Sequence, residues 1–358
     1  MRFVFGGDLV PRTKSEQRFI EKDVGTFGDV APFMQGADRV FVNLECALTV
    51  SENAIPKFGP NLKAAPECAD TLKLAGVTDV LLSNNHTFDY GIEGLKETVK
   101  NLDRVGLPYT GIGENDVDSR RPYFIDQDGK KIAIINVCEH EYTYALPNRM
   151  GANPFDPFLT MQDVRFAKKQ ADYVIVVYHG AKEHCRYPSP RVRNLCHELA
   201  HNGADVVLLQ HSHCIGCYEC YEGCHILYGQ GNFHFCDYLK TEGWNSGLVV
   251  ELDISDKIAI KFHPIILGES GIWFAKGKEY DEIMNPFYKR NEELLNGKWL
   301  DGWKAFCKTE EKWYMDALVG LGPDADDRTK QLFTHYLDCE AHTDVWREIF
   351  PSWNLTNK

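Results

Sequence analysis

The chain has 358 residues, and 52 Asp and Glu against 39 Lys and Arg give it a formal net charge of −13. This length is too great for a disulfide-stabilised miniprotein, and a hydrophobic content of 44% is sufficient to build a core. The acidic balance argues against binding of nucleic acid or of anionic membranes, because basic patches drive both.

Short apolar runs alternate with helical stretches over about the first three quarters of the chain. We expect strands at residues 2–6, 40–43, 77–83, 123–126, 131–137, 173–178, 205–209, 226–228, 248–252 and 258–264. We expect helices at residues 66–75, 91–105 and 190–202, each with Gly just past its end or Pro at its start, and helix or loop at 15–22 and 27–36.

This alternation predicts a parallel or mixed sheet covered by helices. The added hairpins, one of them turning at Asp128-Gly129, predict a second sheet packed on the first. From about Gly277 the strand signals vanish, and residues 282–295, 299–319 and 326–350 are predicted helices. We therefore divide the chain into an α/β region, residues 1–275, and a helical C-terminal extension, residues 276–358, packed on the core.

Neither a secretory signal nor a membrane-spanning segment is recognisable in the sequence. The chain starts directly with a strand-like run, and its apolar runs stay well short of the ~18 residues of a membrane helix. We therefore expect a cytoplasmic protein with reduced thiols and no membrane span. A chain that has lost its anchor would have the same appearance.

Polar residues able to bind a metal follow five of the predicted strands. They are Asp8, Asn43-Leu44-Glu45, Asn84-Asn85-His86, His179, and the pair His211 and His213. Any one of them alone is more often a helix cap or a turn residue. Together they form a mixed nitrogen and oxygen donor set, which suits Mn, Fe, Zn or Ni. An extended backbone would point His211 and His213 the same way, whereas a loop would aim them differently.

Six segments of the chain resemble the CapA-type (poly-gamma-glutamate or capsule synthesis) family of the calcineurin-like metallophosphoesterase superfamily. They are Phe5-Gly6-Gly7-Asp8, Val42-Asn43-Leu44-Glu45, Ser83-Asn84-Asn85-His86-Thr87-Phe88-Asp89-Tyr90-Gly91, Tyr178-His179-Gly180, Gln210-His211-Ser212-His213 and Tyr228-Gly229-Gln230-Gly231-Asn232-Phe233. They occur in family order over about residues 1–265. The resemblance implies a four-layered α/β/β/α sandwich with a metal centre at one edge of the sheets.

The resemblance also implies a role for each site residue. Asp8, Glu45, Asn85, His179, His211 and His213 are the implied ligands of one or two divalent metal ions, with Mn, Zn or Fe expected. His86 is the implied histidine that protonates a leaving group, and Asp89 would orient it. Asn43, Asn84 and Asn232 are expected to support the ligands from behind.

One position departs from the phosphoesterase pattern. Many phosphoesterases have a histidine two residues after the first aspartate, and this chain has Val10 there. We therefore expect one tight metal site made by Glu45, Asn85, His179 and His211. A second, weaker site would use Asp8, Glu45 and His213.

Several basic residues lie near these segments in the sequence. Lys57 and Lys63 belong to a Pro/Gly-rich loop, and Lys182, His184 and Arg186 follow His179. We expect them to bind an anionic substrate, although a solvated loop explains the second group equally well.

Four cysteines have the spacing C-x-x-C-x-x-C-x-x-x-C, at Cys214, Cys217, Cys220 and Cys224. This resembles the bacterial ferredoxin run, with His225 replacing the usual Pro. A turn at Glu222-Gly223 would instead make the segment a hairpin, with Cys220 and Cys224 opposite each other. The hairpin separates the thiols, so we do not expect an iron–sulfur cluster or a structural zinc.

Three functions are consistent with the sequence. The first is a metal-dependent hydrolase or transferase of the CapA type, linked to capsule or poly-gamma-glutamate metabolism, with a metal-activated water and His86 as general acid. The second is a non-catalytic polymer-binding accessory protein of capsule assembly. The third is a metal-assisted enzyme that hydrolyses an amide or epimerises a peptide on the same fold. The expected partner is an anionic small molecule or polymer, not nucleic acid, and the sequence leaves the oligomeric state open.

Overall fold

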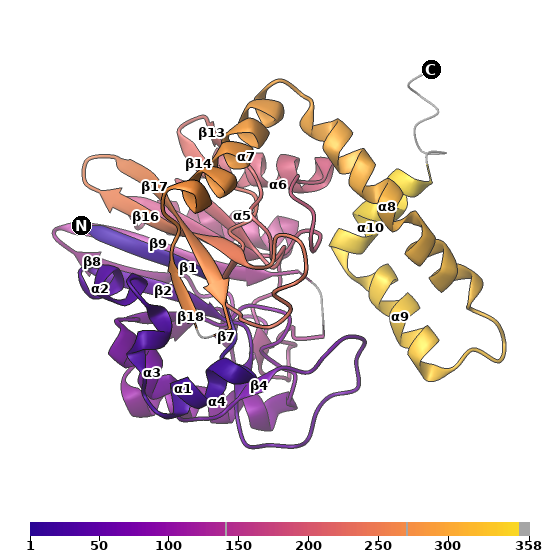
Figure 1. Ribbon diagram of the computed structural model, residues 1–358, viewed down its shortest axis with the longest axis horizontal. Helices are drawn as coiled ribbons and strands as arrows, with labels where there is room; N and C mark the ends of the chain where they lie inside the picture. Colours follow the sequence, from indigo (N-terminus) through magenta and orange to yellow (C-terminus); the bar gives the residue numbers. More distant parts are fainter. Residues whose placement is uncertain (140–141, 270, 351–358) are drawn as a thin grey trace.

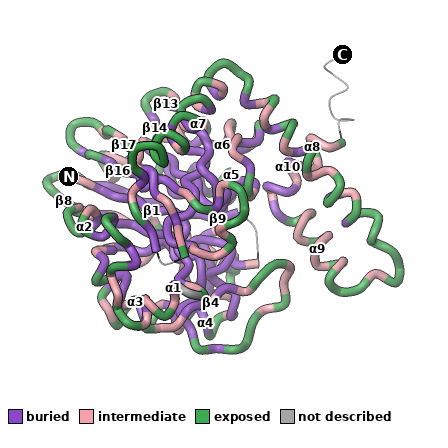
Figure 2. Tube along the Cα trace, viewed as in Figure 1, coloured by how far each residue is buried: buried purple, intermediate pink, exposed green. Residues whose placement is uncertain are grey.

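Two β-sheets lie face to face in the centre of the molecule, as the computed structural model in Figure 1 shows. It describes residues 1–139, 142–269 and 271–350. Buried residues concentrate in the strands, whereas the loops and the outer helical faces are exposed (Figure 2).

The first sheet has eight strands and is built around the N-terminal strand. In spatial order its strands are β18 (Gly271–Phe274), β17 (Ile258–Gly268), β16 (Ser246–Ile254), β1 (Arg2–Leu9), β2 (Arg39–Leu44), β5 (Asp79–Leu81) and β6 (Tyr109–Thr110), with β15 (Asn232–His234) also paired to β1. β1, β2, β5 and β6 run parallel, and β16 to β18 form an antiparallel meander. The carboxyl ends of β1, β2 and β5 therefore meet at one edge.

The second sheet has six strands. In spatial order they are β13 (Tyr218–Tyr221), β14 (Cys224–Leu227), β12 (Val206–Gln210), β11 (Tyr173–His179), β9 (Lys130–Cys138) and β8 (Tyr123–Gln127). The predicted hairpin at Asp128-Gly129 is confirmed: β8 and β9 pair antiparallel across these two residues. Both have positive φ, 51° and 74°, as a tight hairpin turn requires.

Helices cover the outer face of each sheet, so the predicted four-layered α/β/β/α fold is confirmed. The first sheet packs on α1 (Lys14–Ile20), the 3₁₀ helix η1 (Val24–Phe27), α2 (Val30–Gln35), α3 (Cys68–Ala75) and α4 (Gly91–Val105). The second sheet packs on α5 (Pro157–Lys168) and α6 (Pro190–His201). Between the sheets lies a third cluster, in which Phe3, Phe5 and Phe41 face Ile134, Ile175 and Val177.

Helix α5 and seven short strands were not expected from the sequence. Three of these strands, β6, β15 and β18, belong to the first sheet. The other four form two small ladders, β3 (Ala47–Leu48) with β4 (Lys63–Ala64) and β7 (Ile112–Gly113) with β10 (Gly151–Ala152). Helix α5 begins with a standard cap, because Asp156 accepts from the amides of Phe158 and Leu159 and Pro157 occupies the first turn. This Asp-Pro pair was the available signal for the helix.

The C-terminal region folds into α7 (Lys278–Leu295), α8 (Trp299–Val319), α9 (Asp327–Asp338) and α10 (Glu340–Ile349). Met284 and Phe287 of α7 pack into the cluster between the sheets, whereas α8 to α10 gather at one side of the molecule around Trp303 and Tyr314 (Figure 1). The single helix expected at 326–350 is wrong. Cys339 has extended angles, φ −86° and ψ 130°, and divides the segment in two.

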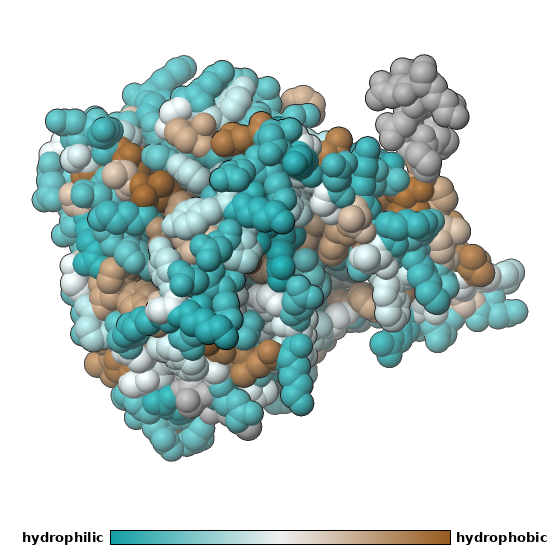
Figure 3. All heavy atoms as spheres, turned by 45° about the horizontal axis from the view of Figure 1, so that its top comes forward, coloured by the Kyte–Doolittle hydropathy of each residue, from teal (hydrophilic) through white to brown (hydrophobic). Residues whose placement is uncertain are grey.

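The surface is mostly hydrophilic on the face shown in Figure 3, with hydrophobic residues in small separate groups. Among the helices of the described residues, none has both the length and the apolar character to cross a lipid bilayer.

Candidate metal centre

The predicted ligands come from both sheets and meet at one edge. Asp8 ends β1 and Glu45 follows β2 in the first sheet, whereas His179 ends β11 and His211 follows β12 in the second. All four side chains are buried, with exposed fractions of 0% to 4%. Parallel strands deliver their carboxyl ends to the same edge, which explains why residues so distant in sequence converge.

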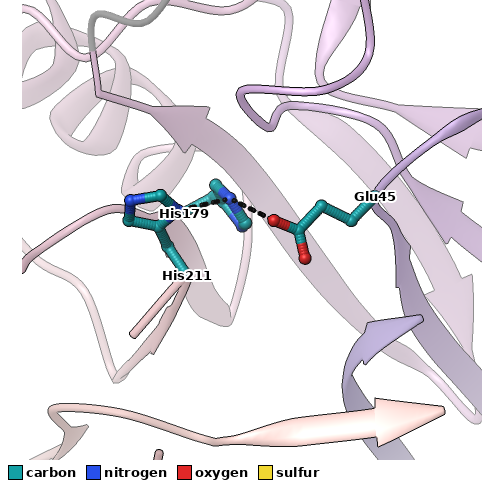
Figure 4. Close-up of side chains that lie close together, drawn as sticks. All are labelled: Glu45, His179 and His211. Carbon is teal, nitrogen blue, oxygen red and sulfur yellow. Dashed lines mark hydrogen bonds and ion pairs between the residues drawn. The ribbon is translucent and has the colours of Figure 1, made fainter. Parts of the chain in front are cut away.

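One group of candidate metal ligands surrounds the ring of His179 (Figure 4). Its Nε2 lies 3.4 Å from Glu45 Oε1, 3.2 Å from His211 Nδ1 and 2.9 Å from Asn85 Oδ1. Glu45, His179 and His211 each offer a ligand atom, and these atoms lie within 4.8 Å of one another. A carboxylate and two imidazoles at this spacing fit a divalent transition metal.

Asp8, Glu45 and His213 form a second group that fits a cation. His213 Nδ1 lies 3.5 Å from Asp8 Oδ2, and its Nε2 lies 3.7 Å from Glu45 Oε1. Burial, followed by the charge of Glu45, raises the pKa of Asp8 to about 7. Burial lowers the pKa of His213 to about 3, which keeps this imidazole in the neutral form that binds metals. Two buried carboxylates side by side repel each other, and a divalent cation between them relieves this repulsion.

Buried amides hold these side chains in place. Asn43 Nδ2 donates to Asp8 Oδ1 at 2.8 Å and lies 3.1 Å from His179 Nδ1. Asn84 Nδ2 donates to Asn43 Oδ1 at 3.0 Å, and Asn232 Oδ1 lies 2.9 Å from His213 Nδ1. Asn43, Asn84 and Asn232 thus contact the candidate ligands or one another, and contacts of this kind fix ring orientation.

The loop after β12 is not extended. His211 and His213 have positive φ angles of 80° and 50°, so the idea that an extended strand points both rings the same way is wrong here. Left-handed backbone at residues other than glycine is uncommon and clusters at functional sites. The turn lets His211 face His179 while His213 faces Asp8 and Asn232.

His86 lies beside the cluster and lines an open cavity of about 250 Å³. Its Nδ1 is 2.6 Å from Asp89 Oδ2, and Lys57 forms an ion pair with the other oxygen of Asp89. The cavity is lined by Pro60, Leu62, His86, Glu183, His184, His213, Phe235, Tyr238, Thr241 and Trp244. The bond to Asp89 fixes the His86 ring and leaves its Nε2 for a ligand in the cavity.

The structure does not gather the five predicted substrate-binding residues into one place. Lys57 reaches Asp89 and His86, and His184 lines the cavity. Lys63 instead donates to Ser51 O at 2.8 Å and to Glu52 at 2.6 Å. The other two pair with carboxylates: Lys182 faces Glu310 of α8 at 4.0 Å, and Arg186 faces Glu242 at 3.2 Å.

Glu183 is a site residue that sequence reasoning missed. It lines the cavity, and its carboxylate forms a third candidate cation group with His211 and His213. The sequence offered one signal, its place four residues after His179 between Lys182 and His184. Phe235 and Trp244 were missed as well, because nothing in the sequence links them to the metal segments.

The cysteine segment forms the predicted hairpin of β13 and β14, but the expected cross-strand pair is wrong by one residue. Cys224 faces Tyr221, and Cys220 faces His225. Cys220 is exposed, whereas Cys214, Cys217 and Cys224 are buried. Burial raises the pKa of Cys214 to about 11, so this thiol is protonated at neutral pH.

Two bacterial proteins named CapA are similar to this chain. The capsule biosynthesis protein CapA of Bacillus anthracis is 29% identical over 227 residues, which cover 61% of this chain and 54% of that protein. The PGA biosynthesis protein CapA of Bacillus subtilis (strain 168) is 29% identical over 245 residues, which cover 67% of this chain and 63% of that protein. The matched part therefore spans less than two thirds of either relative.

Among solved structures, a hypothetical protein from Thermus thermophilus has a TM-score of 0.47 and 17% identity, and the match covers 76% of this chain and 99% of that one. The family described as "Bacterial capsule synthesis protein PGA_cap" matches residues 2–237, which include every segment of the candidate metal centre. The match covers more than half of the chain, so the resemblance predicted from the sequence is confirmed and the chain belongs to this family of bacterial capsule synthesis proteins.

Proposed function

We propose that the chain is a metal-dependent hydrolase or transferase of capsule or poly-gamma-glutamate metabolism that acts on a phosphoester or an amide. The observation that carries the proposal is the convergence of Glu45, His179 and His211 beside the cavity that His86 lines. A mixed carboxylate and imidazole set next to a cavity with an oriented histidine is typical of hydrolytic metal sites.

Glu45, His179, His211 and Asn85 would hold the first metal ion, and Asp8 and His213 would complete a second site with Glu45. Mn, Zn or Fe suits these ligands. When bound, such an ion lowers the pKa of water and polarises a phosphoryl or acyl oxygen.

His86 would act as the general acid. Asp89 accepts from its Nδ1 and so directs Nε2 to the substrate, where the ring donates a proton to the leaving group. Lys57 balances the buried charge of Asp89. Phe235 and Trp244 line the cavity and add apolar surface to its wall.

Val10 is the observation that favours the second candidate, a non-catalytic accessory protein that binds a capsule polymer. It stands where many phosphoesterases have a histidine, and its side chain is fully buried in the apolar cluster under α1 to α4. It therefore adds no donor to the site.

Metal content and turnover test the proposal together. Protein purified without added metal is analysed for bound transition metal, reconstituted with Mn, Zn or Fe, and assayed with p-nitrophenyl phosphate and with a γ-glutamyl anilide. We expect about one equivalent or more of metal, and turnover that falls at least about a hundredfold in His86→Ala, the size typical of general acid loss. The exposed His201, replaced by Ala, is the matched control.

Two results would count against the proposal. Less than about half an equivalent of metal, no rise on reconstitution and no effect of His179→Ala would exclude the metal site, since ligand loss sharply lowers affinity. Tight metal binding without turnover of either substrate class would favour the accessory protein.

A further inference from the structure

A second, smaller cavity lies behind the wall of the first. It has a volume of about 110 Å³ and is lined by Arg186, Ile215, Gly243, Ser246, Glu282, Ile283, Pro286 and Arg290. Thr241 and Trp244 line the His86 cavity, whereas Gly243 and Ser246 line this one. The segment 241–246 therefore separates the two cavities.

Arg290 of α7 is a buried cation in this cavity, with an exposed fraction of 7%. Its Nε donates to Gly216 O and its Nη2 to Ile215 O, both at 3.0 Å. Within the described residues it forms no ion pair, and its two hydrogen bonds use only Nε and Nη2. Two neutral carbonyls orient the guanidinium but leave its charge uncompensated, which is costly in a buried position.

Arg186 brings a second guanidinium to the same cavity. It packs against Gly243, where a Cβ would lie only 3.0 Å from Nη2. Its partner at 3.2 Å is Glu242, whose side chain is 89% exposed, so solvent screens that pair. Burial and then the charge of Arg186 lower the pKa of Arg290, as expected of two cations that face each other without a buried anion.

The other groups around the cavity do not supply the missing charge. Glu282 is 62% exposed and pairs with Lys278 at 3.2 Å. Cys214 and Cys217 lie close to the two arginines, but burial raises the pKa of both thiols, so they are neutral. Ser246, an uncharged residue, also lines the wall. In a chain of net charge −13, this is a cationic pocket without a buried counter-ion among the described residues.

We propose that the cavity between Arg186 and Arg290 binds an oxyanion, the phosphate or carboxylate group of a ligand. Guanidiniums are the donors that recognise such groups, and the volume suits a group of that size. Arg186 lies within the family match, residues 2–237, whereas Arg290 lies beyond its end, so the match does not cover the whole site.

Titration calorimetry with inorganic phosphate and, separately, with acetate tests the site. The metal centre also attracts anions, so the measurement is made in His179→Ala protein as well as in the metal-loaded protein. We expect phosphate or acetate to bind His179→Ala, and Arg186→Gln in that background to weaken binding at least about tenfold, the effect of losing one charge-assisted contact. Tighter phosphate binding assigns the site to a phosphate group, and tighter acetate binding to a carboxylate.

The Arg186 side chain is 37% exposed, so its replacement should leave the fold intact. Arg290 is buried, so a melting curve of Arg290→Gln is recorded to check that this variant is folded before its anion binding is measured. Glu242→Gln is the matched control and should keep or strengthen binding, because it removes only the exposed competitor for Arg186. A crystal soaked with selenate should show the anomalous signal between the two arginines. No anion binding in His179→Ala protein, or binding that Arg186→Gln leaves unchanged, would overturn the proposal, whatever the outcome for the metal centre.

Discussion

Lys57 and Lys63 come from the same loop but end in very different surroundings. Lys57 is 3% exposed and pairs with the fully buried Asp89. Lys63 is 27% exposed and pairs with Glu52, a side chain that is 89% exposed. From the sequence we predicted the same role for both lysines, because residue type and loop composition do not show which ammonium group is buried.

Replacing each lysine by Met should separate these roles. Lys57→Met leaves the Asp89 carboxylate buried without its cation, so the free energy of unfolding should fall by about 3–5 kcal/mol. Lys63→Met removes a solvent-screened pair and should cost less than about 1 kcal/mol. Urea unfolding followed by circular dichroism measures both. Equal losses in the two variants would contradict the difference in burial.

His234 at the end of β15 should make stability depend on pH. The ring is buried between Phe19 and Phe27 and contacts Thr26 Oγ1 at 2.9 Å, and burial lowers its pKa to about 4. Between pH ~6.5 and ~4 His234 binds a proton in the unfolded chain but stays neutral in the folded chain. The free energy of unfolding therefore falls as the pH falls, by up to about 3 kcal/mol. Above pH ~6.5 His234 is neutral in both states, so its full contribution to the free energy of unfolding is present.

The difference between wild type and His234→Gln isolates this group from the other titrating residues. Unfolding in urea at pH 7.5, 5.5 and 4.5 should show a steeper loss of stability in wild type than in the variant. Parallel curves for the two proteins would show that His234 does not cause the pH dependence.

At the scale of elements, the sequence predicted helix bounds correctly where apolar spacing and a terminal glycine define them. Helix α4 has the bounds expected from its sequence, because its apolar positions recur at helical spacing and Gly106 ends it in the left-handed conformation. Helix α5 was missed although Asp156 and Pro157 mark its start, because its apolar face is short and interrupted. The break at Cys339 had no signal, since neither Gly nor Pro occurs there.

The residues of the candidate metal centre also divide into those that the sequence could predict and those that it could not. Its candidate ligands could be picked out in the sequence because each follows a recognisable strand in a motif. Glu183 and Trp244 were not predicted, because loops without a regular sequence pattern bring them to the cavity. The position of such loops depends on how the two sheets pack, which the local sequence does not show.

Helix α10 should depend on one buried carboxylate for its attachment. Asp344 accepts from Ser189 Oγ at 2.6 Å and from Arg191 Nε at 2.9 Å, at the start of α6. Asp344→Ala should loosen α8 to α10 and speed the hydrogen exchange of their amides at least about tenfold, while α5 stays protected. Asp327→Ala, which removes a 97% exposed carboxylate in α9, is the control. Unchanged exchange in Asp344→Ala would mean that the apolar contacts around Trp303 suffice.

For the whole molecule, the important feature is that the candidate metal ligands belong to different sheets. Asp8 and Glu45 come from the first sheet, and His179, His211 and His213 come from the second. A bound ion would therefore join the two halves of the sandwich at the edge where apolar packing gives way to buried polar groups. Binding to the folded state alone stabilises a protein by an amount that grows with ligand concentration.

Metal removal should accordingly lower the stability of the entire fold. At a metal concentration about a hundred times the dissociation constant, binding contributes about 2.7 kcal/mol, so a chelator should lower the melting temperature by several degrees. His179→Ala should melt near the chelated wild type and show no further response to chelator, whereas His201→Ala should respond as wild type does. Calorimetric scans with and without chelator measure this. A wild-type melting temperature indifferent to both chelator and added metal would show that no ion links the sheets.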